Sequence, residues 1–254
     1  MKRYIPLLFL TLLTIIFDGC KKDPEPIEIT GHQQYGEPFS NVPATEDIVM
    51  YEVNLRSFSQ DGNLVGIQQK FDHLASLGVN VIWLMPIQIN GGPLNSPYCI
   101  SNFYEVDEEY GTLADLRAFV AEAHNRNMAV ILDWVANHTS WDHPWIDSTG
   151  WHTTDAQGNI IHPSGTNWTD VADLNFDHLD LQHQMIDVMR YWVLESNVDG
   201  YRCDAADYVP FDFWQKAIDS LRSIPNREII MLAEGARVDH FDAGFDMNFD
   251  WNFY

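Results

Sequence analysis

From residue 48 onward, short continuous apolar runs alternate with longer stretches in which apolar residues recur every three or four positions. A continuous run bounded by glycine or proline is typical of a strand buried on both faces, whereas the longer spacing is typical of an amphipathic helix. The runs predict strands over residues 48–55, 79–87, 128–135, 198–205 and 228–233. The amphipathic stretches predict helices over residues 64–77, 113–127, 179–196 and 211–224.

This alternation indicates a parallel sheet, which is either doubly wound or closed into a barrel. A doubly wound sheet that binds dinucleotides would carry glycines after its first strand, and residues 54–58 (Asn-Leu-Arg-Ser-Phe) contain none. Polar residues instead follow the carboxyl ends of the strands, where barrels carry their chemistry: Asp133, Asn137, His138, Arg202, Asp204 and Glu234. We therefore expect an α/β fold, a TIM (β/α)8 barrel of which strands 1–5 are present and residues 245–254 approach a sixth.

A long irregular segment interrupts the alternation after the third predicted strand. Residues 137–177 are rich in Trp, Asp, His and Gly, and loops of this length are usually functional or form a small subdomain. We expect an inserted subdomain over residues 139–177. Its tryptophans would either stack on flat ligands or form the subdomain core, and we expect at least half of them in the core: Trp141, Trp145, Trp151 and Trp168.

The first residues have the pattern of an export signal. Lys2 and Arg3 precede an apolar stretch over residues 4–17, which is shorter than the ~20 residues of a membrane span. The following Gly19-Cys20 resembles a bacterial lipoprotein signal, in which the cysteine is lipidated; a plain signal peptide with an incidental cysteine is the alternative. We expect a signal peptide over residues 1–19, a tether over residues 20–46, and a protein that is exported across the inner membrane and held by its lipid on the periplasmic or the cell-surface face of the envelope.

Composition narrows the possible partners. The chain has 14 Lys and Arg against 37 Asp and Glu, a net charge of −23, which argues against nucleic acid because phosphates would be repelled. Aromatic residues make up 13% of the chain and suit either sugar faces or a large core. Cys99 and Cys203 have no metal-binding spacing, and we expect both to be free and buried. The histidines of the irregular segment, at spacings that fit no common zinc pattern, are His138, His143, His152 and His162.

Two of the strand-end residues suggest a reaction. Asp204 and Glu234 follow neighbouring predicted strands, and adjacent strands lie ~4.8 Å apart, so the carboxylates could face each other at ~5–5.5 Å. That separation is typical of a retaining glycosidase, in which one carboxylate attacks the anomeric carbon and the other protonates the leaving oxygen and then activates water. The apolar residues 232–233 before Glu234 are compatible with an acid that stays protonated. The alternative is that both are surface acids of a very acidic protein.

Several short motifs carry a resemblance to a known family. Residues 133–138 (Asp-Trp-Val-Ala-Asn-His), residues 200–204 (Gly-Tyr-Arg-Cys-Asp) and the strand that ends at Glu234 together resemble the α-amylase family, glycoside hydrolase family 13. Residues 95–98 and 172–175 are also similar to family segments. The resemblance covers residues 47–254 and implies a partial (β/α)8 catalytic domain that hydrolyses α-glucosidic bonds in starch or maltooligosaccharides with retention. A transglycosidase or isomerase with the same intermediate, or a non-catalytic glycan-binding lipoprotein on a degenerate barrel, remain alternatives.

The resemblance also implies a role for each site residue. Asp204 would be the nucleophile, Glu234 the general acid and base, and Arg202 the cation that keeps the nucleophile ionised. Tyr98 and His138 would bind the sugar by stacking and by a hydrogen bond, and Asp133 would hold Arg202 from beneath.

The sequence departs from the family pattern in two places. Many members continue the nucleophile motif with Lys-His, which contact the glucan and help bind calcium, whereas this chain has Asp207 and Tyr208. This departure argues against calcium, whereas Asn137 and Asp173 occupy positions that often ligate Ca²⁺ through oxygen and argue for it. Calcium is therefore an open question, and no organic cofactor is expected. The family's third essential carboxylate, in a His-Asp pair after the seventh strand, has no counterpart here, so we expect a C-terminally truncated fragment that is inactive alone.

Overall fold

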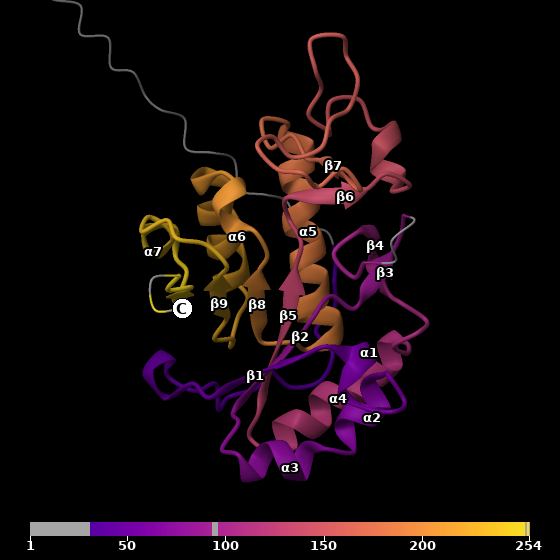
Figure 1. Ribbon diagram of the computed structural model, residues 1–254. Helices are drawn as coiled ribbons and strands as arrows, with labels where there is room; N and C mark the ends of the chain where they lie inside the picture. The colour runs from indigo at the N-terminus through magenta and orange to yellow at the C-terminus, as the bar shows by residue number, and fades with distance from the viewer. Residues whose placement is uncertain (1–30, 93–95, 252, 254) are drawn as a thin grey trace, which may run out of the picture.

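A computed structural model describes residues 31–92, 96–251 and 253, and its centre is a six-stranded sheet (Figure 1). Every neighbouring pair of strands is parallel, and the spatial order follows the chain order without a reversal. The strands are β1 (Met50–Val53), β2 (Val81–Leu84), β5 (Ala129–Trp134), β8 (Gly200–Cys203), β9 (Ile230–Ala233) and β10 (Met247–Asn248). A doubly wound sheet would reverse its order at one point, whereas sequential order is that of a partial TIM barrel, so the predicted fold class is confirmed.

The sheet has one more strand than the five expected. β10 contributes only two residues, and they pair in parallel with Leu232 and Ala233 of β9. The expectation that residues 245–254 approach a sixth strand is therefore confirmed. The strand itself was not predicted, because two residues are too few to produce a periodic pattern.

Helices follow the strands and cover one face of the sheet (Figure 1). Their bounds are α1 (Leu55–Phe58), α2 (Leu64–Gln68), α3 (Phe71–Ser76), α4 (Leu113–Asn125), α5 (Leu179–Ser196), α6 (Phe211–Arg222) and α7 (His240–Ala243). Three short 3₁₀ helices are η1 (Thr45–Asp47), η2 (Pro144–Asp147) and η3 (Ala206–Tyr208). The single helix predicted over residues 64–77 is in fact two, α2 and α3, because the backbone leaves the helical conformation at Lys70.

Side chains alternate between the two faces of the sheet, as in any strand. On the helix-covered face Ile82, Val130 and Met231 belong to the large apolar core. Their neighbours Val81 and Ile131 belong to a smaller cluster on the opposite face, which is the inside of a barrel.

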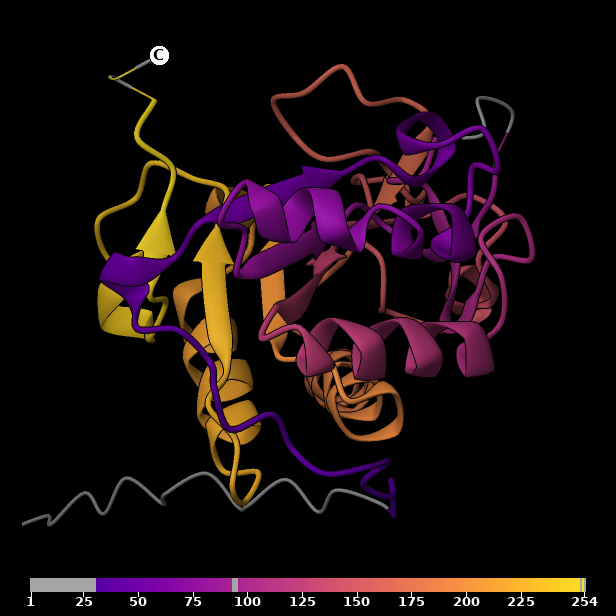
Figure 2. The same cartoon turned by 90° about the horizontal axis from the view of Figure 1, so that it is seen from below.

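The segment before β1 closes the lower end of this inner face. Phe39 and Val42 pack against the smaller apolar cluster. Asn41 is hydrogen-bonded to Asn127, just before β5, and the N–H of Val49 donates to Asn80, just before β2. Figure 2 shows the segment passing beneath the sheet. The opposite end, where the strands finish, is left for chemistry.

Two antiparallel pairs stand outside the main sheet at its carboxyl end. β3 (Gln88–Asn90) pairs with β4 (Ile100–Val106), and β6 (His138–Ser140) pairs with β7 (Val171–Asp173). The first pair was not predicted. The second frames the long irregular segment, whose status as a subdomain over residues 139–177 stays a prediction.

The four tryptophans of that segment differ in how they pack. Trp145 and Trp151 contact each other at 5.2 Å between ring centroids and pack against the main core. Trp141 is 39% exposed, and Trp168 is half-buried at the carboxyl end of the sheet. Two of the four thus pack against the core, and both are partly buried.

The described residues test some of the other expectations and not those for the first thirty residues. Cys99 and Cys203 are free and buried, as predicted. Within residues 31–92, 96–251 and 253, none of the helices is long and apolar enough to cross a membrane. The predicted signal peptide, the lipidated Cys20 and the first part of the tether lie outside the described residues.

Candidate active site

The register of the sheet sets the positions of the polar residues at its carboxyl end. Asp133 of β5 is paired directly with Arg202 of β8. One residue further, Cys203 is paired with Ala233 of β9, so Asp204 and Glu234 leave adjacent strands at the same level. The ladder continues past the strand ends, because the N–H of Asp204 donates to Trp134 and the N–H of Glu234 donates to Cys203, at 2.9 and 3.0 Å.

Arg202 joins three carboxylates. Its Nη1 lies 2.7 Å from Oδ1 of Asp133 and 2.9 Å from Oδ1 of Asp204, and its Nη2 lies 2.7 Å from Oε2 of Glu234. The guanidinium also contacts the rings of Trp83 at 4.9 Å and Phe249 at 5.7 Å. A planar guanidinium with its donors in fixed directions holds the two candidate catalytic carboxylates in one geometry.

Asp133 supports this arrangement from beneath. Its side chain is fully buried, and its Oδ2 accepts hydrogen bonds from Oη of Tyr98 and Nε1 of Trp83, both at 3.1 Å. Burial raises the pKa of Asp133 to about 6, and the adjacent Arg202 opposes that shift. The expected position of Asp133 under Arg202 is therefore what the structure has.

The protonation of Asp204 differs from the expectation. Its burial and the neighbouring Asp133 carboxylate raise the pKa of Asp204 well above the usual range, while Arg202 lowers it. Arg202 thus acts in the expected direction, but the expected net stabilisation of the ionised form is wrong for this structure. The main reason is the burial of the Asp204 carboxyl, and the neighbouring Asp133 adds to it, because one buried cation is shared among three acids.

Glu234 lies in a polar setting rather than the apolar one that its sequence neighbours suggested. Its Oε2 accepts the N–H of Ala205 at 2.9 Å in addition to the ion pair with Arg202. A quarter of its side chain is exposed, 25%, so it is the most accessible of the three carboxylates. The apolar side chains of residues 232–233 point to the two faces of the sheet and not to this carboxylate.

A pocket of about 280 Å³ opens beside these carboxylates. Its lining consists of Ser96, Tyr98, Cys99, His138, Trp168, Asp170, Val171, Asp204, Ala205 and Glu234. Four of the residues predicted from sequence therefore line one cavity, with Asp133 and Arg202 directly below it. The remaining two predicted positions, Asn137 and Asp173, are not part of the lining.

His138 is buried and its polar atoms are engaged. Its Nε2 lies 3.2 Å from the carbonyl of Tyr98, and its Nδ1 lies 3.3 Å from the amide nitrogen of Asn137. Burial lowers the pKa of His138 to about 4, so the ring is neutral and donates from Nε2 to the carbonyl. The expected hydrogen bond to a sugar would have to replace this contact. The ring of Trp168 meets it edge-on at 5.9 Å.

Some pocket residues had no signal in the sequence. Asp170 accepts the thiol hydrogen of Cys99 at 3.3 Å, and burial raises the pKa of Cys99 to about 12, which keeps the thiol protonated. Val171, the first residue of β7, lines the same wall. These contacts depend on how two loops far apart in sequence meet, so no local pattern points to them.

The predicted calcium positions do not form a metal site by themselves. Asn137 and Asp173 lie close together, since the N–H of Leu174 donates to the carbonyl of Asn137 at 3.1 Å, and burial raises the pKa of Asp173. Ca²⁺ takes six to eight oxygen ligands. Among the described residues, there is no group of three or more His, Cys, Asp or Glu arranged to hold a metal ion. The two residues alone thus fit calcium poorly. Calcium binding stays a prediction.

The other histidines of the irregular segment serve the packing of that segment. His143 accepts the N–H of Trp145 at 3.0 Å and contacts its ring at 4.6 Å. His152 is 2.9 Å from the hydroxyl of Thr139. Burial lowers the pKa of both to about 4.

Comparisons with known proteins agree with this geometry. The family model for the α-amylase catalytic domain matches residues 33–164 and 165–244. The α-amylase MalA of Haloarcula japonica is 31% identical over 230 residues, which cover 85% of this chain and 34% of that protein. The trehalose synthase/amylase TreS of Mycobacterium tuberculosis is 35% identical over 199 residues, which cover 63% of this chain and 33% of that protein.

Solved structures give the same result. An α-amylase from Lactobacillus plantarum superimposes with a TM-score of 0.76 at 34% identity, over 82% of this chain and 54% of that one. An α-amylase from Geobacillus thermoleovorans, complexed with acarbose, superimposes with a TM-score of 0.73 at 28% identity, over 84% and 53%. The chain spans about a third of these curated relatives and about half of these solved chains.

Proposed function

Because the chain belongs to the α-amylase catalytic-domain family of glycoside hydrolases, we propose that the protein is a retaining α-glucan hydrolase. Its substrates would be starch or maltooligosaccharides, in which it cleaves α-glucosidic bonds. The described residues supply six strands of the barrel sheet, and the chain covers only part of its relatives, so the proposal concerns the activity of the full-length protein.

One observation carries the proposal: Asp204 and Glu234 leave adjacent strands at one level, share one guanidinium and line one pocket. Two carboxylates fixed on the same side of a cavity suit a mechanism that needs both on one glycosidic bond. Tyr98 and His138 on the wall of that cavity support sugar binding there.

The mechanism divides into two displacements. In the first, an oxygen of ionised Asp204 bonds to the anomeric carbon while Glu234 gives its proton to the leaving glycosidic oxygen. In the second, Glu234 takes a proton from water, the water oxygen bonds to the anomeric carbon, and the bond to Asp204 breaks.

The proposal is tested by the stereochemistry of the product. The full-length protein is incubated with maltopentaose, and the anomeric protons of the first products are followed by NMR before mutarotation. Two displacements at one carbon predict an α product. A β product would contradict the two-step mechanism, and the absence of any cleavage would favour the glycan-binding alternative.

A second activity of the same site is favoured by one relative. TreS, at 35% identity, is named a trehalose synthase as well as an amylase. A sugar hydroxyl that takes the place of water in the second displacement would give transfer instead of hydrolysis. Products longer than the starting maltooligosaccharide, or isomeric disaccharides, would identify transfer.

We also propose that the protein acts outside the cytoplasm on a lipid anchor. The support is the sequence alone: a basic start, a short apolar stretch and Gly19-Cys20. The membrane would then be a partner through the lipid on Cys20, on the periplasmic or the cell-surface face, while the α-glucan is the partner of the pocket.

A further inference from the structure

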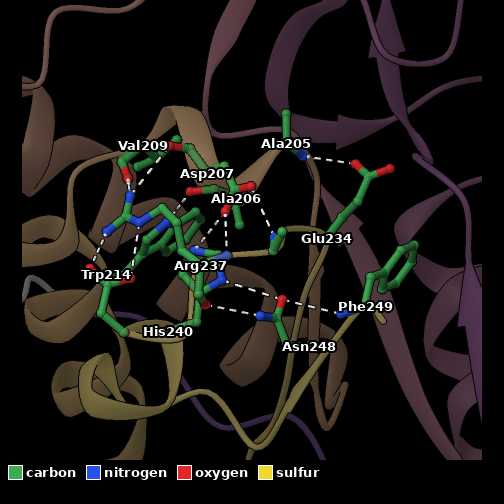
Figure 3. A network of polar contacts seen from close by, with 12 residues as sticks. Ala205, Ala206, Asp207, Val209, Trp214, Glu234, Arg237, His240, Asn248 and Phe249 are labelled. Carbon is green, nitrogen blue, oxygen red and sulfur yellow. Dashed lines mark hydrogen bonds and ion pairs between the residues drawn. The ribbon is translucent and has the colours of Figure 1, made fainter. Parts of the chain in front are cut away.

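A network of polar contacts joins the loop after β8 to the loop after β9 and includes Glu234 (Figure 3). Glu234 holds the first of these loops. Its side chain accepts the N–H of Ala205 and its carbonyl accepts the N–H of Ala206, both at 2.9 Å. The candidate acid is therefore bonded to the turn that directly follows the candidate nucleophile.

Asp207 makes the reciprocal contacts. Its Oδ2 accepts the N–H of Ala236 at 2.9 Å, and its Oδ1 accepts the N–H of Arg237 at 3.2 Å. Gly235 allows this approach, because a Cβ there would lie 2.4 Å from Oδ1 of Asp207. The chain that directly follows Glu234 is thus folded around the Asp207 carboxylate.

Arg237 closes the arrangement from the other side. Its Nη1 donates to the carbonyls of Asp207 and Val209, at 3.3 and 3.1 Å, and its own carbonyl accepts from the amide of Asn248 at 2.9 Å. The buried ring of His240 lies 3.5 Å from Oδ1 of Asp207. We call the contacts of Asp207 with Ala236 and Arg237, and of Arg237 with Asp207 and Val209, the Asp207 clasp.

The clasp stabilises an unusual backbone at the point where Glu234 is held. Ala205 has φ 46° and ψ 41°, in the left-handed region that a residue with a Cβ adopts at a cost. That conformation directs its N–H to Glu234. A strained conformation persists only where its surroundings fix it. The contacts of Asp207, two residues further along the chain, help to fix this loop.

We propose that Asp207 is a positioning residue for Glu234, which it aims at the glycosidic oxygen by tying residues 235–237 to the loop after β8. The inference rests on the proposed function. Many members of the α-amylase family carry at this position a lysine that reaches the glucan. In this chain the side chain at that position, Asp207, bonds to the loop after β9 and holds the two catalytic loops together.

The chemistry makes this role separable from simple stability. Proton transfer to a leaving oxygen requires hydrogen-bond distance, and a displacement of about 1 Å costs about 100-fold in rate. A leaving group that departs without a proton, such as fluoride, does not depend on the aim of Glu234 in the first step. Azide likewise attacks the covalent intermediate without needing a base.

The test compares two substrates in the full-length protein and its Asp207→Asn variant. Asparagine keeps the shape of the side chain but replaces one of the two oxygens that accept Ala236 and Arg237. We expect turnover of maltopentaose to fall by about 30–100-fold, while turnover of α-glucosyl fluoride with azide stays within about threefold. The measured quantity is the ratio of the two rates.

A second variant reaches the same contact from the other loop. Gly235→Ala would push the Asp207 carboxylate away from the backbone and should change the ratio in the same direction. Asp212→Asn, an exposed aspartate in the first turn of α6, is the matched control and should leave the ratio unchanged.

The outcomes separate the two levels of the argument. If the unaltered protein turns over neither substrate, the proposed function fails, and the role of Asp207 fails with it. If the unaltered protein turns over both and the variants lose both rates equally, or lose neither, the proposed function stands and the positioning role is wrong. Melting temperatures of the variants identify an equal loss as unfolding.

Discussion

At the scale of single residues, the site depends on one buried cation. Arg202 is bonded to Asp133, Asp204 and Glu234 together, so no carboxylate can move without changing the contacts of the others. The sequence identified these four residues because polar side chains stand out at the ends of apolar strands. It could not predict the sign of the net pKa shift of Asp204, since that sign depends on burial and on how many acids share the cation.

Replacing either candidate catalytic carboxylate should abolish activity with little change in the fold. In the full-length protein, Asp204→Asn and Glu234→Gln are each expected to lower the turnover of maltooligosaccharides by at least about a thousandfold, because each acts in both displacements. Asp219→Asn, an exposed aspartate of α6, is the control. Activity near that of the unaltered protein in either catalytic variant would show that its role is assigned wrongly.

Asp133 should give the stability of the protein a particular pH dependence. Its pKa of about 6 in the folded protein lies above the ordinary value of 3.8, so between pH 4 and 6 the folded state holds a proton that the unfolded state has released. The stabilisation of the folded state by protonated Asp133 is therefore fully present below pH 4 and is lost as the pH rises through 6. This loss lowers the free energy of unfolding by up to about 3 kcal/mol.

The measurement is the free energy of unfolding by urea at pH 4, 5, 6 and 7, for the unaltered protein and for Asp133→Asn. As the pH rises, the free energy of unfolding of the unaltered protein should fall relative to that of Asp133→Asn. A difference that is constant, or that shifts the other way, would contradict a raised pKa at Asp133.

At the scale of elements, the prediction was best where a pattern was long. The helix predicted over residues 179–196 has those bounds in the structure, because eighteen residues give several turns of apolar spacing. The pair β3 and β4 was missed, since a three-residue strand has no measurable period and its partner begins ten residues later. The split between α2 and α3 was missed because the apolar spacing continues across the point where the helix is interrupted.

The stability of the long segment after β5 should depend on its partly buried tryptophans, which pack against the core. Trp145 contacts the rings of Phe103, His143 and Trp151, so Trp145→Ala is expected to lower the free energy of unfolding by about 2–4 kcal/mol. Trp141 is 39% exposed and serves as the matched control, with an expected cost for Trp141→Ala below about 1 kcal/mol. Chemical denaturation measures both values, and an equal cost would mean that the segment has no such core.

At the scale of the whole molecule, sequential parallel strands leave one end of the sheet to the segment before β1 and the other end to the pocket. The alternation of strands and helices predicted a parallel sheet, and the polar residues at the strand ends favoured a barrel over a doubly wound sheet. The pocket wall was less predictable, because Ser96, Cys99 and Asp170 come together only through the meeting of two loops. Of the many acidic residues that the structure describes, only Asp170, Asp204 and Glu234 line the pocket.

The proposed anchor has a direct test. In cells given labelled palmitate, the full-length protein should incorporate label and fractionate with membranes, and Cys20→Ser should do neither. Cys99→Ser is the control, since that thiol is buried in the folded domain. Label that persists in the Cys20→Ser variant would rule out lipidation at this residue.

The central claim is that Asp204 forms a covalent bond to the sugar, and trapping that bond tests it most directly. The full-length protein is incubated with 5-fluoro-α-glucosyl fluoride, whose fluorine slows the second displacement, and peptic peptides are analysed by tandem mass spectrometry. Our account predicts one glycosyl group, attached to the carboxyl of Asp204. A label on Glu234, or turnover of the reagent with an inverted product and no labelled peptide, would contradict it.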